Sequence, residues 1–345
     1  MRLLFIITHS ILCKSLTNAG KKKKMLSSLL ETISNIPFFG TQTFGIAAMI
    51  IVGSSWCLVG LIMGAAPKRG IDPGLIQLLG FVCTCLFSIP AMIITGGVPD
   101  CSWKIIALTW GALALGGLLN FFMLQLMSYA MQRGPNGVIW AVIQSALVFP
   151  FIGGILFFGV KLNWTRGGGI ICLLTALVFF AMTKNNSNYR GGWRLPALLA
   201  LLLAAIQQNL TTMPSYFQEA RAVGSIARTL ATASGGLLGA VIYNFFRMNR
   251  THWQTLCSNI KNPLTWYYTL ALQLFNLIFA YILFYPGMNA MADAGLGGMC
   301  YPMMVGSCIV SFSITAVLLL KEKFSLLQLS GLVICISGLV LICCP

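Results

Sequence analysis

The chain has 345 residues, of which 58% are hydrophobic and only 8% are charged, and its mean hydropathy is +0.86. A water-soluble domain needs a polar exterior, so this composition excludes a soluble globular protein and indicates an integral membrane protein. The net charge of +16 would suggest a nucleic-acid partner in a soluble chain. Here the basic residues fall in the N-terminal tail and at helix ends, where they set orientation and meet lipid headgroups, so we expect a bilayer and no nucleic acid.

Residues 1–41 form a basic N-terminal tail that differs from the rest of the chain. The apolar run "MRLLFIITHSILC" is too short to cross a bilayer, and "KSLTNAGKKKKM" follows it. No small-residue cleavage site follows the apolar run cleanly, which argues against a signal peptide. The alternatives are a disordered cytosolic tail or upstream sequence included by a wrong start site.

Ten segments are apolar enough to cross a hydrocarbon layer of roughly 30 Å as helices, each of which needs about 20 residues. We predict an all-α membrane protein with spans at 43–64, 74–96, 105–131, 136–158, 165–183, 195–215, 223–246, 265–288, 296–319 and 325–343. Pro, Gly, Lys and Arg interrupt the apolar pattern between the spans, so these breaks, including 247–253, are predicted to be short loops.

The distribution of Lys and Arg gives two opposite orientations. Outside the tail, the loops after spans 1, 3, 5, 7 and 9 carry 11 basic residues and those after spans 2, 4 and 6 carry four, which places both termini outside. The tail adds six basic residues and argues for the reverse. The orientation is therefore left open.

The second half of the chain contains a stretch whose sequence resembles one in the first half. The stretch "AMQRGPNGVIWAVIQSALVFP" at 130–150 is echoed by "AMADAGLGGMCYPMMVGSCIV" at 290–310, and each is followed by a Lys-containing loop and a further apolar helix. The repeating unit is five spans long. Because an odd number of spans reverses direction, the second copy must enter the membrane inverted, an architecture used by transporters.

We therefore predict two inverted five-helix repeats. The first covers 42–184, a linker loop covers 185–194, and the second covers 195–345. An alternating-access transporter of a small molecule is the function that this architecture favours.

The residues that carry the repeat, 129–164 and 295–342, resemble the drug/metabolite transporter superfamily of ten-helix proteins with two EamA-like repeats. Glu322 matches the acidic position of the superfamily's closing loop, whereas Val160 departs from it. In the turn "APKRGI" and in "GALALGGLLNFFMLQLMSYAMQRG" the layout is most similar to the bacterial rhamnose/proton symporters. The resemblance covers about 45–342 and implies a bacterial inner membrane and a sugar, amino acid or similar solute.

Polar side chains within spans are costly in hydrocarbon and tend to face an interior or a cavity. Trp140 and Gln144 lie four residues apart and share one face of the fourth span, while Tyr301 lies on the matching face of the ninth. Gln273, in the eighth span, is a further polar candidate. The alternative is that such groups only join helices by hydrogen bonds. The predicted cavity residues are Ser55, Trp56, Asn120, Trp140, Gln144, Gln207, Gln208, Asn209, Asn276 and Tyr301.

Three charged residues are candidates for coupling. Arg228 lies within the seventh span and either extends to the interface or binds an anionic group, while Asp293 and Glu322 are acids that could carry a proton at a gate. No acid or histidine falls at mid-membrane, so the coupling ion, a proton or another, stays open. A homodimer is also left open.

Enzyme chemistry, a metal and a cofactor are not expected. Neither a nucleophile with a base nor an acid pair for a metal occurs within the spans, and the 12 cysteines lie mostly in apolar segments without metal-ligand spacing. A passive channel and a non-transporting membrane receptor or partner subunit remain the alternatives to a transporter.

Overall fold

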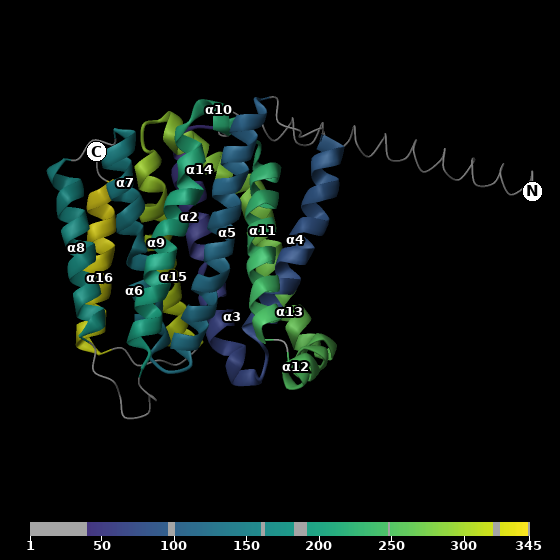
Figure 1. Ribbon diagram of the computed structural model, residues 1–345. Coiled ribbons are helices and arrows are strands. Elements are labelled where there is room, and N and C mark those ends of the chain that lie inside the picture. Colours follow the sequence, from purple (N-terminus) through teal and green to yellow (C-terminus); the bar gives the residue numbers. More distant parts are fainter. Residues whose placement is uncertain are drawn as a thin grey trace, which may run out of the picture.

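The computed structural model describes residues 40–95, 101–159, 163–182, 192–247, 249–319 and 325–343. Within these ranges the chain forms a bundle of helices and contains no strand (Figure 1). The tail 1–39, most of the linker and Glu322 lie outside the described residues.

The first half of the bundle contains two helices that are interrupted within a span. Its elements are α2 (Gln42–Ser55), α3 (Cys57–Ala65), η1 (Pro67–Arg69), α4 (Pro73–Thr95), α5 (Trp103–Met131), α6 (Asn136–Gln144), η2 (Ser145–Leu147), α7 (Val148–Phe158) and α8 (Trp164–Ala181).

The second half contains one interrupted span and, between spans, the short helix α10 and the longer helix α12. Its elements are α9 (Arg194–Tyr216), α10 (Gln218–Arg221), α11 (Ser225–Arg247), α12 (Arg250–Lys261), α13 (Pro263–Phe279), the π-helix η3 (Ala280–Phe284), α14 (Tyr285–Asp293), η4 (Gly297–Met299), α15 (Cys300–Leu318) and α16 (Leu326–Cys343).

Eight helices in the described part are long and apolar enough to cross a membrane, which fits a multi-pass, all-α integral membrane protein. They are Gln42–Arg69, Pro73–Ile94, Trp103–Met131, Asn136–Phe158, Arg194–Tyr216, Ser225–Arg247, Pro263–Asp293 and Gly297–Thr315. The expected spans at 165–183 and 325–343 are the helices α8 and α16, which have 18 residues each and are not among the eight.

One predicted loop is wrong. The break at 247–253 leads into α12, a 12-residue helix whose N-cap Asn249 accepts a hydrogen bond from the backbone of His252 at 2.7 Å. The segment is polar on average, so hydropathy alone gives no sign of a helix there. Its cap and its helical spacing of apolar residues are the local reasons why it forms one.

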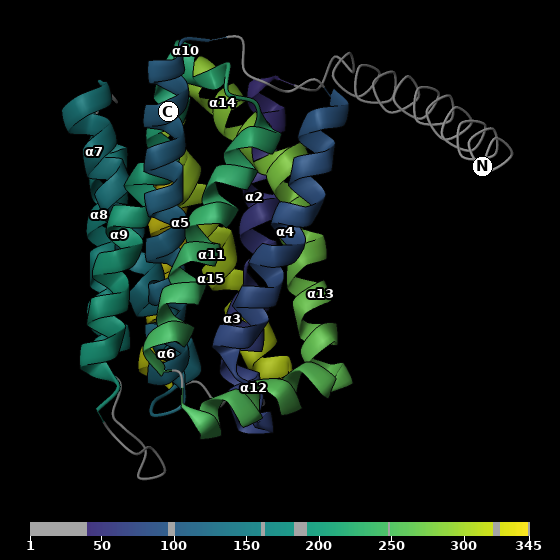
Figure 2. The same cartoon turned by 45° about the vertical axis from the view of Figure 1, so that its right-hand side comes forward.

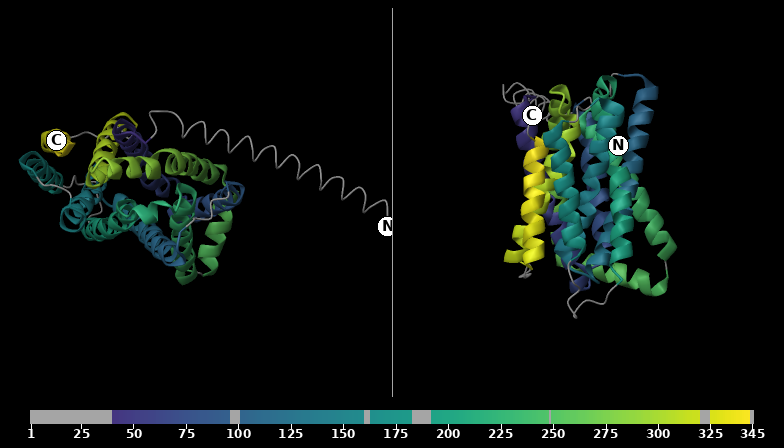
Figure 3. Two further views of the ribbon diagram at one scale, coloured as in Figure 1. Left: turned by 90° about the horizontal axis from the view of Figure 1, so that it is seen from above. Right: turned by 90° about the vertical axis from the view of Figure 1, so that its left-hand side faces the viewer.

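The helices pack as an inner bundle with one outlying pair. α15 is the most buried of the eight membrane-length helices and lies against α2, while α8 and α16 pack on each other at one edge of the molecule (Figure 3). α5 and α11 approach most closely at Gly117 and Gly235, where a Cβ would overlap the carbonyl oxygens of Thr232 and Ala114. Small residues at helix crossings allow this backbone approach in membrane bundles.

Three membrane-length helices are interrupted near the middle of the bundle. Trp56 forms a turn between α2 and α3, the 3₁₀ segment Ser145–Leu147 separates α6 from α7, and the π-helix Ala280–Phe284 separates α13 from α14. Interruptions of this kind re-aim side chains and release backbone groups, and they occur frequently at functional sites.

Candidate solute cavity

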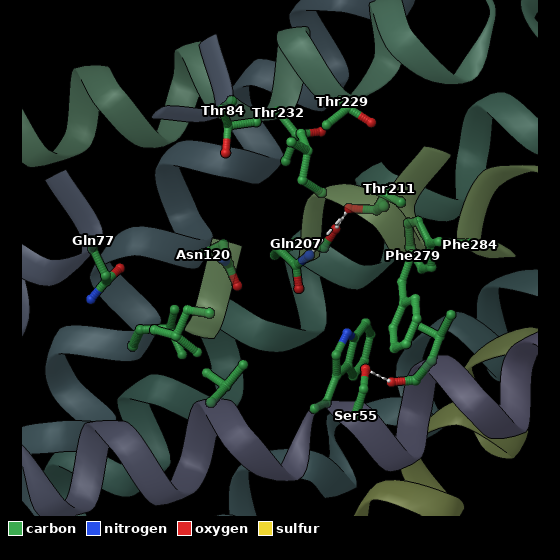
Figure 4. Close-up of a pocket in the computed structure, with 18 of the residues that line it drawn as sticks. Ser55, Gln77, Thr84, Asn120, Gln207, Thr211, Thr229, Thr232, Phe279 and Phe284 are labelled. Carbon is green, nitrogen blue, oxygen red and sulfur yellow. Dashed lines mark hydrogen bonds between the residues drawn. The ribbon is translucent and has the colours of Figure 1, made fainter. Parts of the chain in front are cut away.

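A cavity of about 240 Å³ lies inside the bundle and is lined by helices from both halves of the chain. The interrupted helices form part of its wall, because Trp56, Gln144 and Phe284 all line it. Figure 4 shows polar side chains from several helices, including Gln77, Asn120 and Gln207, directed into the same space. The helix breaks therefore turn side chains toward this cavity.

Eight of the ten residues that the sequence singled out line the cavity. They are Ser55, Trp56, Asn120, Trp140, Gln144, Gln207, Gln208 and Tyr301. Asn209 lies elsewhere: its amide donates to the Ala205 carbonyl at 2.8 Å, and its side-chain oxygen lies over Gly153 of α7. The side chain of Asn276 is outside the described residues.

Sequence reasoning missed most of the hydroxyl groups and one amide of the wall. The missed lining residues with polar side chains are Gln77, Thr84, Thr211, Thr229, Thr232 and Tyr285. Threonine is common within membrane spans, where its hydroxyl bonds the preceding turn of its own helix, as in the bond from Thr211 to the Gln207 carbonyl at 2.9 Å. Gln77 was detectable as the one amide within the second span.

Gln273, on α13, is held in place from α4. The Thr84 hydroxyl donates to Gln273 Oε1 and also bonds the Gly80 carbonyl oxygen at 3.0 Å. The Gln273 amide lies directly over Gly80, in space that a Cβ at Gly80 would occupy. This contact links a helix of each half at the cavity wall.

Aromatic rings form the apolar part of the wall. The Trp56 ring lies 6.2 Å from the ring of Phe284 and 6.3 Å from that of Tyr301, both in tilted arrangements. Trp140 is fixed from behind by stacking on Phe312, with ring centroids 5.2 Å apart. Rigid rings of this kind can cover an apolar face of a bound solute.

Four buried polar atoms on the wall make no hydrogen bond of normal geometry with any described residue. They are Gln77 Oε1, Trp140 Nε1, Gln208 Oε1 and the Tyr301 hydroxyl. Trp140 Nε1 lies near the Cys308 sulfur, and the Tyr301 hydroxyl lies near Thr211 and Thr212. Buried polar groups are normally satisfied, and these four atoms have almost no accessible surface, so they lie within the wall behind the cavity surface.

No Asp, Glu, Lys, Arg or His lies on the cavity wall among the residues that the structure describes. The wall therefore combines neutral amides and hydroxyls with aromatic and aliphatic surface. No group of three His, Cys, Asp or Glu in the described ranges could hold a metal ion.

Arg228 lies off this wall, and its side chain is enclosed by the protein. Its side chain is 1% exposed, and its guanidinium donates to the carbonyls of Val223 and Ala220 at 2.8 and 2.9 Å. It also donates to Ser215 Oγ at 3.1 Å and Asn289 Oδ1 at 3.3 Å. The corner formed by α9, α10 and α11 wraps polar groups around the cation, so the guanidinium needs no contact with water.

Asp293 lies at the end of α14, away from the cavity wall. Its carboxylate pairs with Arg221 of α10, whose Nε donates to the Ser215 carbonyl at 2.8 Å. The Asp293 side chain is 65% exposed. Together with Arg228, this pair ties α14 to the α9–α11 corner at one end of the bundle.

Comparisons with known proteins bear on the fold alone. No family model matches the chain, and no curated protein matches it. Several solved structures match, and one of them, the crystal structure of a protein, does so with a TM-score of 0.55 and 14% sequence identity, over 88% of this chain and 96% of that chain. Similarity at this identity shows a shared fold and carries no information on the solute or the reaction.

Proposed function

We propose that this protein is a secondary transporter that moves a small, neutral, polar metabolite across a membrane by alternating access. One observation carries the proposal: a central cavity, lined from both halves of the chain, combines amide- and hydroxyl-bearing side chains with aromatic rings and contains no charged residue among those described. A neutral solute with donors, acceptors and one apolar face suits such a wall. A carboxylate or ammonium group would find no oppositely charged partner among the described residues of this wall.

Helix packing supports ten spans built as two five-helix halves. For this purpose the spans are α2/α3, α4, α5, α6/α7, α8, α9, α11, α13/α14, α15 and α16, in that order. Adding or subtracting five turns the contact between spans 9 and 1 into a contact between spans 4 and 6, and both contacts are present. In the same way, the contact between spans 7 and 3 corresponds to the contact between spans 2 and 8. The pairs 2 with 7, 4 with 9 and 5 with 10 each join equivalent spans. A shift by five spans therefore converts each of these pairs into another observed pair or into itself.

The direction of equivalent spans supports the inverted relation. In Figure 1 the fourth span rises from α6 to α7, and the eighth rises from α13 to α14. The ninth span, α15, follows α14 and so descends, opposite to the fourth. Two halves related in this way can rock about a shared cavity and open it to each side in turn.

This layout agrees with the drug/metabolite transporter architecture that the sequence resembles, and we extend the proposal to that superfamily and to a bacterial inner membrane. The solute within the neutral class and the coupling ion are not specified by the wall. Coupling to protons would need acidic residues outside the cavity wall, such as Asp293, which pairs with Arg221, or Glu322.

Thermal unfolding of the detergent-purified protein tests the proposed site. A ligand that binds only the folded state raises the unfolding temperature, so a panel of neutral sugars, polyols and nucleosides should contain stabilising compounds. Charged analogues of the same size should not stabilise the protein. Stabilisation by amino acids or organic acids, with none by neutral solutes, would contradict the proposal.

A passive channel or a receptor would use the same cavity without alternating access. The tie between α14 and the α9–α11 corner favours a transporter, because an open pore has no need of a buried guanidinium network closing one end.

A further inference from the structure

Helix α12 is the one described helix of more than ten residues that lies across the end of the bundle instead of along it (Figure 2). It joins α11 and α13, and both of these belong to membrane-length helices. Since α11 ends and α13 begins where the chain leaves the hydrocarbon, α12 lies at the level of the membrane interface.

One side of α12 is attached to the bundle. Leu256 and Asn259 are buried, and a ring nitrogen of His252 lies 3.1 Å from Asn244 Oδ1 on α11 in a hydrogen bond. These three residues of α12 lie at helical spacings of four and three and so form one face. The helix therefore has a fixed rotation on the bundle, and this rotation determines which of its residues point away from the bundle.

The exposed surface of α12 is ordered around the helix. At about 100° per residue, Trp253, Cys257 and Ile260 form an apolar stripe directly beside the buried face. Trp253 is 56% exposed and Ile260 is 41% exposed. Arg250 and Lys261 border the stripe on its far side, and beyond them come the neutral polar residues Thr251, Gln254, Thr255 and Ser258. Around the helix, the face on the bundle is followed by an apolar face, a basic edge and a neutral polar face, which is the arrangement of an interfacial amphipathic helix.

The apolar stripe continues onto the neighbouring spans. Phe245 and Phe246, at the end of α11, and Tyr267, near the start of α13, are exposed aromatic residues at the same end of the bundle. Trp266 is partly exposed, and its indole nitrogen donates to the Ile260 carbonyl at 2.8 Å. Aromatic residues collect at the headgroup level of membranes, so this surface fits lipid and not water.

The end of the bundle that carries α12 is strongly basic. In the described ranges it holds Lys68, Arg69, Arg133, Arg194, Arg247, Arg250 and Lys261 against the single acid Asp72. The opposite end holds Lys104, Arg166, Arg221 and the buried Arg228 against Glu219 and Asp293. An excess of basic residues in short loops marks the cytoplasmic side of membrane proteins.

We propose that α12 is a docking surface for anionic phospholipids of the cytoplasmic leaflet. Trp253, Cys257 and Ile260 enter the headgroup boundary, and Arg250 and Lys261 bind the phosphate groups. The surface complements the negative potential of that leaflet. It also implies an orientation in which Gly40 and Cys343 lie on the other side of the membrane, which follows the basic residues of the described loops and not the six of the N-terminal tail. This inference depends on membrane insertion and not on transport.

The test measures thermal unfolding of the full-length protein in a neutral detergent, titrated with phosphatidylglycerol or with phosphatidylcholine. Phosphatidylglycerol should stabilise the wild type at lower concentration, and 1 M salt should remove that preference. Arg250→Gln and Lys261→Gln should each weaken the apparent affinity for phosphatidylglycerol by about fivefold, and the double variant by about 25-fold, with phosphatidylcholine unaffected.

Lys104→Gln is the matched control, because it removes one exposed basic residue at the opposite end of the bundle. It should leave the preference for phosphatidylglycerol unchanged. Equal stabilisation of the wild type by the two lipids, or a double variant that titrates like the wild type, would overturn the proposal. Measuring both lipids on each variant separates a folding defect from a lost lipid site, and if the double variant is misfolded the two single variants decide the question.

Discussion

At the scale of single residues, neighbouring amides on one helix have opposite roles. Gln208 is 4% exposed and lines the cavity, and its Oε1 makes no hydrogen bond, whereas Asn209 bonds its own helix backbone and packs over Gly153. Sequence reasoning found both as polar residues in a span and could not separate them. Their difference arises from which helix face meets the cavity, and that is set by tertiary packing.

Gln208→Leu should abolish stabilisation by the neutral solute while leaving the unfolding temperature of the empty protein equal or higher. The reason is that the substitution removes a buried acceptor that has no partner in the empty cavity. Asn209→Leu is the control and should keep the full response to the solute. A Gln208→Leu protein that still responds would remove this residue from the site.

The buried cation has a structural role that its sequence position did not reveal. Arg228→Met should lower the unfolding temperature of the empty protein strongly, because each carbonyl left without its donor costs about 1–3 kcal/mol. Asp293→Asn, which breaks the exposed ion pair nearby, should cost only about 0–1 kcal/mol. Similar losses for the two variants in the same unfolding assay would show that the Arg228 network is not a main stabilising contact.

At the scale of elements, the sequence predicted the order and type of the helices because apolar runs of about 20 residues have few alternatives in hydrocarbon. It did not predict their interruptions. Trp56 and the segments Ser145–Leu147 and Ala280–Phe284 contain no Pro or Gly, but Pro150 and Pro286 follow the two segments, and each leaves the carbonyl four residues earlier without its helical donor. These two interruptions therefore had a local signal in the sequence, whereas the turn at Trp56 had none of this kind. The sequence prediction missed α12 because hydropathy averages over a helix whose faces differ.

The crossing of α5 and α11 depends on glycine. Gly235→Ala should force the two helices apart and destabilise the protein by about 1–3 kcal/mol, because its Cβ would overlap the Ala114 carbonyl oxygen. Gly111→Ala, on α5, the other helix of the crossing, has open space around the new Cβ and should cost nothing in the same thermal unfolding measurement. Equal effects of the two substitutions would mean that the crossing tolerates a wider separation.

At the scale of the whole molecule, the account depends on two halves that move about one neutral cavity. The proposal of such halves is supported by the packing pairs that map onto each other under a shift of five spans and by the opposite directions of the fourth and ninth spans. The local sequence echo of residues 130–150 in 290–310 favours the same proposal because it preserves the order of its landmarks. The pairing of distant helices could come only from three-dimensional packing.

Counterflow in proteoliposomes tests alternating access most directly. Vesicles containing the protein are loaded with an excess of the neutral solute that stabilises it most, diluted, and given a trace of the same solute in labelled form. The account predicts a transient accumulation of label above its equilibrium level that saturates with solute concentration and is absent in Gln208→Leu. Label that equilibrates without overshoot, as through a pore, or that never enters would contradict it.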